Sequence, residues 1–126
     1  MPLTFYDLPM SQPARAVLAL LTLTKIPHEK VQVKLNKQEH KTGEFLKINP
    51  IGTIPAIDDD GFHLGESEAI MKYLINSRKA GEEYYPLDPK KRALVDRYYP
   101  FHHGLFRPSL IKYFVSNHPI AKGNIT

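Results

Sequence analysis

Residues 3–35 read LTFYDLPMSQPARAVLALLTLTKIPHEKVQVKL, and this stretch decides the fold of the chain. Its start, residues 3–6, is a short apolar run typical of a strand, and the apolar residues that follow Ser11 recur at helical spacing. Pro27 marks the end of that helix. Residues 29–35 alternate strictly and predict a half-buried strand with one apolar face, formed by Val31, Val33 and Leu35. A strand, a helix and a second strand in this order form a right-handed parallel crossover.

The rest of the first domain follows a second pattern, after an irregular stretch. A short helix is expected around GEFLKI at 43–48, with a break at Asn49. The segment PAIDDDGFHL at 55–64 predicts a hairpin around an Asp-Gly turn, and the periodic residues after it predict a helix that ends at Gly81. A βαβ unit followed by a ββα unit predicts an α/β fold, namely a thioredoxin-like domain with a mixed four-stranded sheet over residues 1–79.

The remaining residues predict the start of a second, all-helical domain. Residues 80–88 form a linker without periodicity, and Asp88 followed by a proline predicts a helix start, so an incomplete helical domain is expected over 89–126. Pro100 and Pro108 lie inside this helical pattern and are expected to kink or end the helix. Much of its aromatic cluster is expected to be exposed in so short a domain: Tyr98, Tyr99, Phe101, Phe106, Tyr113 and Phe114.

Composition excludes several classes of function. The chain of 126 residues has no cysteine, which excludes disulfides, thiolate metal sites and a thiol nucleophile supplied by the protein. Adjacent histidines, His102 and His103, do not face one site from a helix, so no metal site is predicted. The net charge of +4 is spread between acids and apolar residues, which favours a small anionic ligand and no nucleic acid. No signal peptide or membrane span is apparent, so a cytoplasmic protein is expected.

Ser11 has two interpretations from the residues alone. A serine before an apolar helical segment is a preferred N-cap, because its side-chain oxygen accepts a hydrogen bond from a free backbone N–H. A serine hydroxyl at the junction of a strand and a helix is also a group that enzymes use for chemistry. Both interpretations remain open at this point.

Two further motifs suggest a ligand with an amino-acid end. A cis peptide between Ile54 and Pro55 would leave the backbone of Ile54 free to pair with an extended peptide. Ser67 can cap the following helix and bind an anion with its own N–H, while the carboxylate of Glu66 suits an ammonium group. The alternative for this pair is a plain helix cap with an acid in the first turn.

Three segments together resemble a known family. YDLPMSQPARA at 6–16, NPIGTIPAIDDDGF at 49–62 and LGESEAIMKYL at 64–74 resemble, in this order and spacing, the N-terminal domain of glutathione S-transferases. The serine before Gln-Pro, together with His40 and the Glu-Ser pair, is most similar to the theta class. The resemblance covers residues 3 to about 107.

The resemblance implies a set of glutathione contacts and no other cofactor. The γ-glutamyl group would contact the Glu-Ser pair, and the cysteinyl backbone would pair with the backbone of the residue before the cis proline. The glycine carboxylate would lie near a histidine. The residues at these positions are Glu66 and Ser67, Ile54 before Pro55 with Thr53 adjacent, and His40 with Lys41. Gln12 lies in the same first helical turn, and Ser11 would face the glutathione sulfur as the catalytic residue.

The role implied for Ser11 is physically reasonable. An ordinary thiol has a pKa of about 8.5. Lowering this pKa by about two units requires roughly 2.7 kcal/mol of preferential stabilisation of the thiolate. A hydroxyl hydrogen bond and the positive end of a helix together supply most of that. Ser11 would then be a hydrogen-bond donor, and it needs no histidine partner.

The function implied is a homodimeric, cytoplasmic glutathione transferase that attaches glutathione to electrophilic small molecules in detoxification. Residues 89–126 cover only the beginning of the helical domain that completes the second-substrate pocket, so we expect a fragment or a short natural form. The alternative is a non-catalytic module for binding or dimerisation, as in the translation elongation factor subunits that resemble this domain. A thiol-disulfide oxidoreductase is excluded by the absence of cysteine unless its chemistry relies on glutathione alone.

Overall fold

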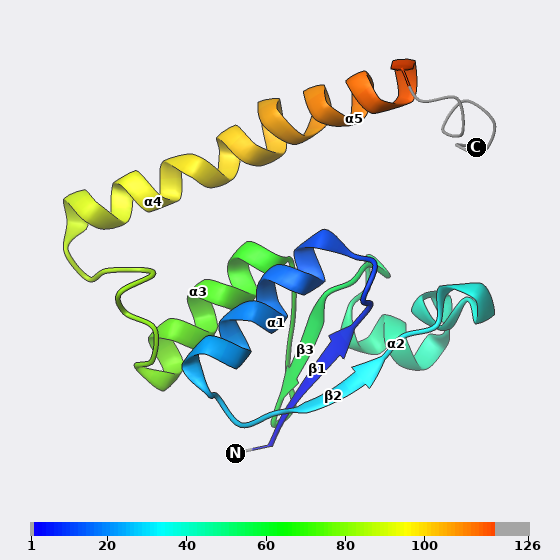
Figure 1. The fold of residues 1–126 in the computed structure, drawn as a ribbon. Coiled ribbons are helices and arrows are strands. Elements are labelled where there is room, and N and C mark those ends of the chain that lie inside the picture. The colour runs from blue at the N-terminus through cyan, green and yellow to red at the C-terminus, as the bar shows by residue number, and fades with distance from the viewer. Residues whose placement is uncertain (1, 118–126) are drawn as a thin grey trace. The chain divides into compact units, whose positions relative to one another are not determined.

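The computed structural model describes residues 2–117, and its contacts divide into two compact units between Tyr84 and Tyr85. This division lies inside the predicted linker, and the two units are described separately. The first unit opens with strand β1 (Leu3–Asp7), helix α1 (Gln12–Thr24) and strand β2 (Glu29–Gln32), and β1 and β2 are parallel (Figure 1). The predicted crossover unit is therefore confirmed.

A hairpin completes the sheet. Strands β3 (Ala56–Asp59) and β4 (Phe62–Gly65) pair with each other in antiparallel fashion, and β3 also runs antiparallel to β1. The strand order is β2-β1-β3-β4, and helix α3 (Ser67–Arg78) follows the last strand. This is the thioredoxin-like arrangement that the order of elements predicts.

Alternation along β1 separates the two faces of the sheet. Leu3 and Phe5 are almost fully buried on the face that α1 and α3 cover, and these two helices lie side by side across it (Figure 1). Tyr6 points to the opposite face, where its ring meets the ring of Phe45 edge to face at 5.6 Å. Phe45 belongs to the short helix α2 (Gly43–Ile48), so α2 covers this second face.

The second strand departs from its prediction. It ends at Gln32, and all four of its residues are exposed. Val31 is 43% exposed and Leu35 is 45% exposed, whereas Val33 is buried beneath α2. The predicted strand is present, but its predicted extent over residues 29–35 and its half-buried face were wrong, because β2 is an edge strand and the chain enters a 3₁₀ turn at Leu35.

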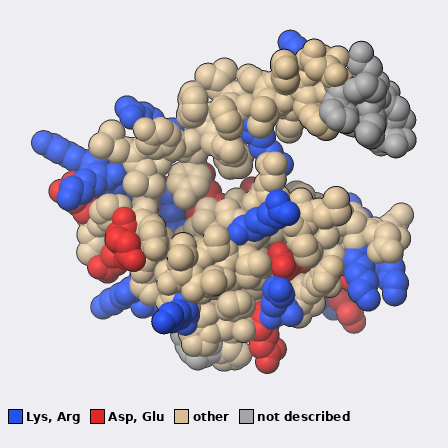
Figure 2. All heavy atoms as spheres, in the orientation of Figure 1, with Lys and Arg blue, Asp and Glu red and all other residues tan. Residues whose placement is uncertain are grey.

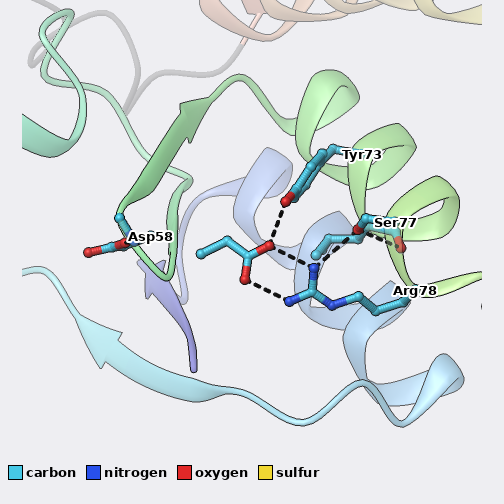
Figure 3. Close-up of polar contacts among 7 residues, drawn as sticks. Asp58, Tyr73, Ser77 and Arg78 are labelled. Atoms are coloured by element: carbon cyan, nitrogen blue, oxygen red, sulfur yellow. Dashed lines mark hydrogen bonds and ion pairs between the residues drawn. The ribbon is translucent and has the colours of Figure 1, made fainter. Parts of the chain in front are cut away.

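A buried ion pair ties α3 to the sheet. The guanidinium of Arg78 donates to both carboxylate oxygens of Asp59 at 2.6 and 2.7 Å, and the hydroxyl of Tyr73 donates to one of them at 2.6 Å (Figure 3). These hydrogen bonds, with that of Arg78 the largest cause, hold the pKa of Asp59 below its usual value. Asp58, the preceding residue, points to the other side of the strand (Figure 3).

The second unit is helical over its described part. Helix α4 (Pro89–Phe101) begins where Asp88 accepts a hydrogen bond from the backbone N–H of Lys91 at 2.9 Å. A π-helical turn (His102–Phe106) and helix α5 (Arg107–Asn117) continue it. Residues 118–126 of the predicted helical domain lie outside the described residues.

Neither proline ends the helical run, so of the two expected outcomes, a kink or an end, the end was wrong. Pro100 lies within α4, and Pro108 lies in the first turn of α5. Between them, the N–H of Arg107 reaches the carbonyl oxygen of His102, five residues earlier. This wider turn accommodates a proline that lacks the N–H for the ordinary bond four residues back. The expected aromatic exposure is confirmed, with Tyr98 60% and Tyr113 68% exposed.

Candidate functional site

Charge alone does not single out a site. On the face shown in Figure 2, basic and acidic side chains are interspersed and do not gather into a patch of one sign. The register of the strands, and not a charged patch, indicates where the site lies.

The register of the sheet brings three sequence motifs to one end. Tyr6 pairs with Ala56, and Ala56 pairs with Gly65, across three neighbouring strands. Because β3 runs antiparallel to both neighbours, the residues after β1, before β3 and after β4 all emerge at this end. The loop to Ser11, the peptide at 54–55 and the Glu-Ser pair are therefore neighbours in space although they are far apart in the sequence.

Ser11 is the N-cap of α1. Its side-chain oxygen accepts a hydrogen bond from the backbone N–H of Ala14 at 3.2 Å, and its own N–H donates to the carbonyl oxygen of Leu8 at 2.8 Å. A hydroxyl that accepts one hydrogen bond still carries a proton to donate. The two interpretations of Ser11 are therefore compatible. Gln12 is the first residue of the helix and is exposed.

The peptide between Ile54 and Pro55 is cis, as the thioredoxin-like fold implies. Pro55 is buried, Ile54 is half-buried and Thr53 is exposed. The three residues lie directly before β3, at the end of the sheet where the motifs meet.

Asn49 holds this loop in place, and the sequence reading missed it. The side chain is 4% exposed and its amide donates to the carbonyl oxygen of Thr53 at 2.8 Å and to the Thr53 hydroxyl at 3.2 Å. The amide oxygen accepts from the N–H of Ile51 at 3.3 Å. A Cβ atom at Gly65 would lie 2.9 Å from the Asn49 amide nitrogen, so Asn49 also packs against the end of β4. Asn49 is followed by Pro50, and this pair predicted only the break after the short helix.

Gly52 lets the irregular segment approach the same loop. It has a φ of +71°, and a Cβ atom there would lie 3.0 Å from the His40 carbonyl oxygen and 3.0 Å from the Lys41 ammonium nitrogen. His40 and Lys41 therefore lie against the residue next to Thr53. The Nδ1 atom of His40 is buried and has no hydrogen-bond partner among the described residues.

The Glu-Ser pair differs in one detail from its prediction. Glu66 is the residue in the N-cap position, with a φ of +68° and no side-chain capping bond. Ser67 is the first residue of α3 and is 9% exposed, so the expectation that Ser67 caps the helix was wrong. The exposed Glu66 side chain and the uncapped helix start together offer a carboxylate beside free backbone N–H groups.

Comparison with known proteins decides the family. The family profile described as "Glutathione S-transferase, N-terminal domain" matches residues 1–76, which is more than half of the chain. The chain belongs to the glutathione S-transferase family. It is 42% identical over 111 residues to glutathione S-transferase 1 of Manduca sexta, with 87% of this chain and 51% of the relative covered.

Two theta-class relatives confirm the resemblance seen in the sequence. Glutathione S-transferase theta-1 of Rattus norvegicus is 38% identical over 103 residues, with 82% of this chain and 43% of the relative covered. The structure of human glutathione transferase theta-2 in complex with glutathione and an unknown ligand superimposes with a TM-score of 0.77 at 38% identity, covering 81% of this chain and 42% of the other. The chain thus spans about half the length of the curated relatives it matches. Among residues 2–117, no helix combines the length and the apolar character needed to cross a bilayer.

Proposed function

We propose that the first unit binds glutathione and that the protein is a glutathione transferase which uses Ser11 to stabilise the thiolate. The observation that carries this proposal is the register of the sheet, which brings a free hydroxyl proton, the peptide before Pro55 and the Glu66 carboxylate to one end. Each of these groups matches a different part of one tripeptide. The human theta-2 relative was solved with glutathione bound, which supports the same ligand here.

The γ-glutamyl end would occupy the start of α3. Its ammonium group pairs with the carboxylate of Glu66, and its carboxylate accepts from the N–H of Ser67 and the adjacent free N–H groups of the first turn. Burial of Ser67 favours strong hydrogen bonds there, since water competes less.

The cysteinyl backbone would pair with Ile54 as a short extended peptide beside Pro55 and Thr53. Its sulfur then lies toward Ser11, whose oxygen accepts from Ala14 while its hydroxyl keeps a proton to donate. Gln12 lies beside Ser11 in the first turn, where the helix end favours a negative charge. Ser11 acts as a donor to the thiolate and keeps its own proton.

The glycine carboxylate would lie near His40 and Lys41. The buried Nδ1 of His40 lacks a partner within the described part of the chain, and an N–H there would find one in an anionic carboxylate. The ammonium group of Lys41 lies close to Gly52, on the same side of the loop. These two residues therefore supply the positive charge that the carboxylate needs.

The rest of the proposal concerns the whole protein. We propose that its bound thiolate attacks electrophilic small molecules in detoxification, and that the protein is a cytoplasmic homodimer. A non-catalytic binding or dimerisation module is the second candidate. The exposed apolar side chains of α4 and α5, such as Leu94 and Phe114, favour a surface that a partner covers.

Calorimetric titration of the chain with glutathione tests the proposal directly. We expect saturable binding by the chain, and weaker binding after Glu66→Gln, with Glu82→Gln as a matched control on an exposed acid of the linker region. A folded sample that shows no binding would contradict the proposal. Conjugation activity of this chain, measured beside a longer version with a complete helical domain, separates the enzyme from the non-catalytic module.

A further inference from the structure

His63 on β4 contacts two other elements on the face of the sheet that α2 covers. Its Nδ1 atom lies 3.1 Å from the carbonyl oxygen of Lys47, in the last turn of α2. Its Nε2 atom lies 3.4 Å from a carboxylate oxygen of Asp58, the residue paired with it on β3. The other Asp58 oxygen accepts from the N–H of Gly61 at 2.8 Å.

The charged imidazole suits both contacts better than either neutral form. A neutral imidazole has a single N–H, so one of its two nitrogens presents a lone pair. With the proton on Nδ1, the lone pair of Nε2 faces the Asp58 carboxylate, and with the proton on Nε2, the lone pair of Nδ1 faces the Lys47 oxygen. The imidazolium donates from both nitrogens, and histidine changes its charge between about pH 5 and 8.

The contact with Lys47 satisfies an end of a helix. The last carbonyl groups of a helix have no N–H partner within it, and a positive charge at that end is favourable. The backbone N–H of Ile51, which would continue α2, bonds to the side chain of Asn49 instead. His63 therefore supplies the donor that the helix lacks at this position.

Two adjacent contacts fix the end of α2 to β4. Lys47 meets His63, and two residues farther along each segment Asn49 packs against Gly65. Asn49 in turn holds Thr53 through two hydrogen bonds. His63, the end of α2, Asn49 and the loop before Pro55 are therefore connected by contacts in the folded chain.

We propose that His63 is a charge-dependent positioning residue, whose imidazolium form docks α2 and thereby orders the glutathione-binding loop. This inference rests on the proposed glutathione-binding function. The charged residues in contact with His63 are Asp58 on β3, through its carboxylate, and Lys47 on α2, through its backbone carbonyl oxygen. Tyr6 on β1 is the titratable group whose pKa the charge of Asp58 affects. Burial, and then the charge of Asp58, hold the pKa of Tyr6 above its usual value, so Tyr6 stays neutral at neutral pH and below.

The test compares glutathione affinity at about pH 5.5 and about pH 7.5, the range in which histidine titrates. For each protein we compare the Kd at the higher pH with the Kd at the lower pH. This ratio should be about five times larger for the unaltered chain than for His63→Gln, a factor at the low end of couplings between linked sites. Asp58→Asn should flatten the profile as well, because an amide can donate to the neutral Nε2. His40 is present in all these variants, so its contribution is the same in every comparison. His102→Gln on the other unit is the matched control and should keep the full pH dependence.

Amide hydrogen exchange without ligand provides a second readout. Protection of residues 43–53, corrected for the intrinsic effect of pH, should fall at the higher pH in the unaltered chain and stay constant in His63→Gln. Equal pH dependence of affinity and protection in all variants would overturn the role of His63. Absence of glutathione binding at either pH, with the expected exchange pattern, would instead refute the proposed ligand and leave the docking of α2 by His63 supported.

Discussion

The buried side chain of Asn49 donates to the backbone carbonyl of Thr53 at 2.8 Å and also packs against Gly65 at the end of β4. One side chain thus connects the loop before Pro55 with the strand that leads to Glu66. The two parts of the proposed glutathione site that lie on β3 and β4 share this support.

Replacing Asn49 should therefore affect both stability and binding. Asn49→Ala leaves the Thr53 carbonyl oxygen and the Ile51 N–H without their partner, at a cost of about 1–3 kcal/mol in the free energy of unfolding. Urea denaturation measures this loss, and calorimetry should show weaker glutathione binding at a temperature where the variant is folded. Asn36→Ala, on an exposed residue, should change neither quantity. Unchanged affinity in Asn49→Ala would show that the loop keeps its conformation without this support.

Ser11 can be tested by separating its capping role from its proposed chemical role. Ser11→Ala should cost about 1 kcal/mol of stability, and Ser11→Gly only a few tenths, because glycine is tolerated at an N-cap. Both variants lose the hydroxyl, so both should return the pKa of bound glutathione thiol toward about 8.5 while the affinity stays within a few-fold. Ultraviolet titration of the thiolate measures this pKa. A thiolate that forms as readily in both variants would reduce Ser11 to a helix cap.

Gly52 and Gly61 allow a matched comparison. Both have a positive φ, so alanine at either position carries a backbone cost of about 1–2 kcal/mol. A Cβ atom at Gly61 has open space, whereas one at Gly52 meets the His40 carbonyl oxygen at 3.0 Å. Gly52→Ala should therefore be the less stable variant in urea denaturation and should also weaken glutathione binding. Equal effects on stability would mean that the segment around His40 moves away at no cost.

The ion pair between Arg78 and Asp59 predicts a pH dependence of stability. The pKa of Asp59 is lowered in the folded state, so its contribution is present above the unfolded value of about 3.9 and is lost as the pH falls through the folded value. Arg78→Met leaves the buried carboxylate of Asp59 without its charged partner and should cost about 3 kcal/mol at neutral pH. Denaturation at neutral and acidic pH should show this difference shrinking below about pH 3.9.

Two variants serve as controls for that measurement. Lys79→Met removes an adjacent exposed charge and should have little effect at any pH. Tyr73→Phe removes one hydrogen bond to Asp59 and should cost about 1 kcal/mol. A loss in Arg78→Met that stays constant down to acidic pH would argue against ionised Asp59 as its cause.

Local patterns predicted most of the elements correctly. The helix after Ser11 and the hairpin around Gly61 follow from apolar periodicity and turn residues, which act within a few positions of the chain. The pattern failed where burial depended on distant segments: Val31 and Val33 have the same alternation, yet only Val33 lies beneath α2. The π-helical turn before Pro108 was missed because a wider turn is an alternative to ending the helix that no local rule selects.

The sequence by itself determined the order of strands and helices and the family to which the chain belongs. It also marked Ser11 as a candidate helix cap, and the fold that it predicted implied the cis peptide at Pro55. These depend on side chains acting on their own backbone or on motifs read along the chain. Only the tertiary structure decided that Asn49 donates a hydrogen bond to Thr53, that Arg78 pairs with Asp59 and that His63 contacts the carbonyl oxygen of Lys47. The physical reason is that each of these polar groups is satisfied by a partner whose position is set by strand register and helix packing.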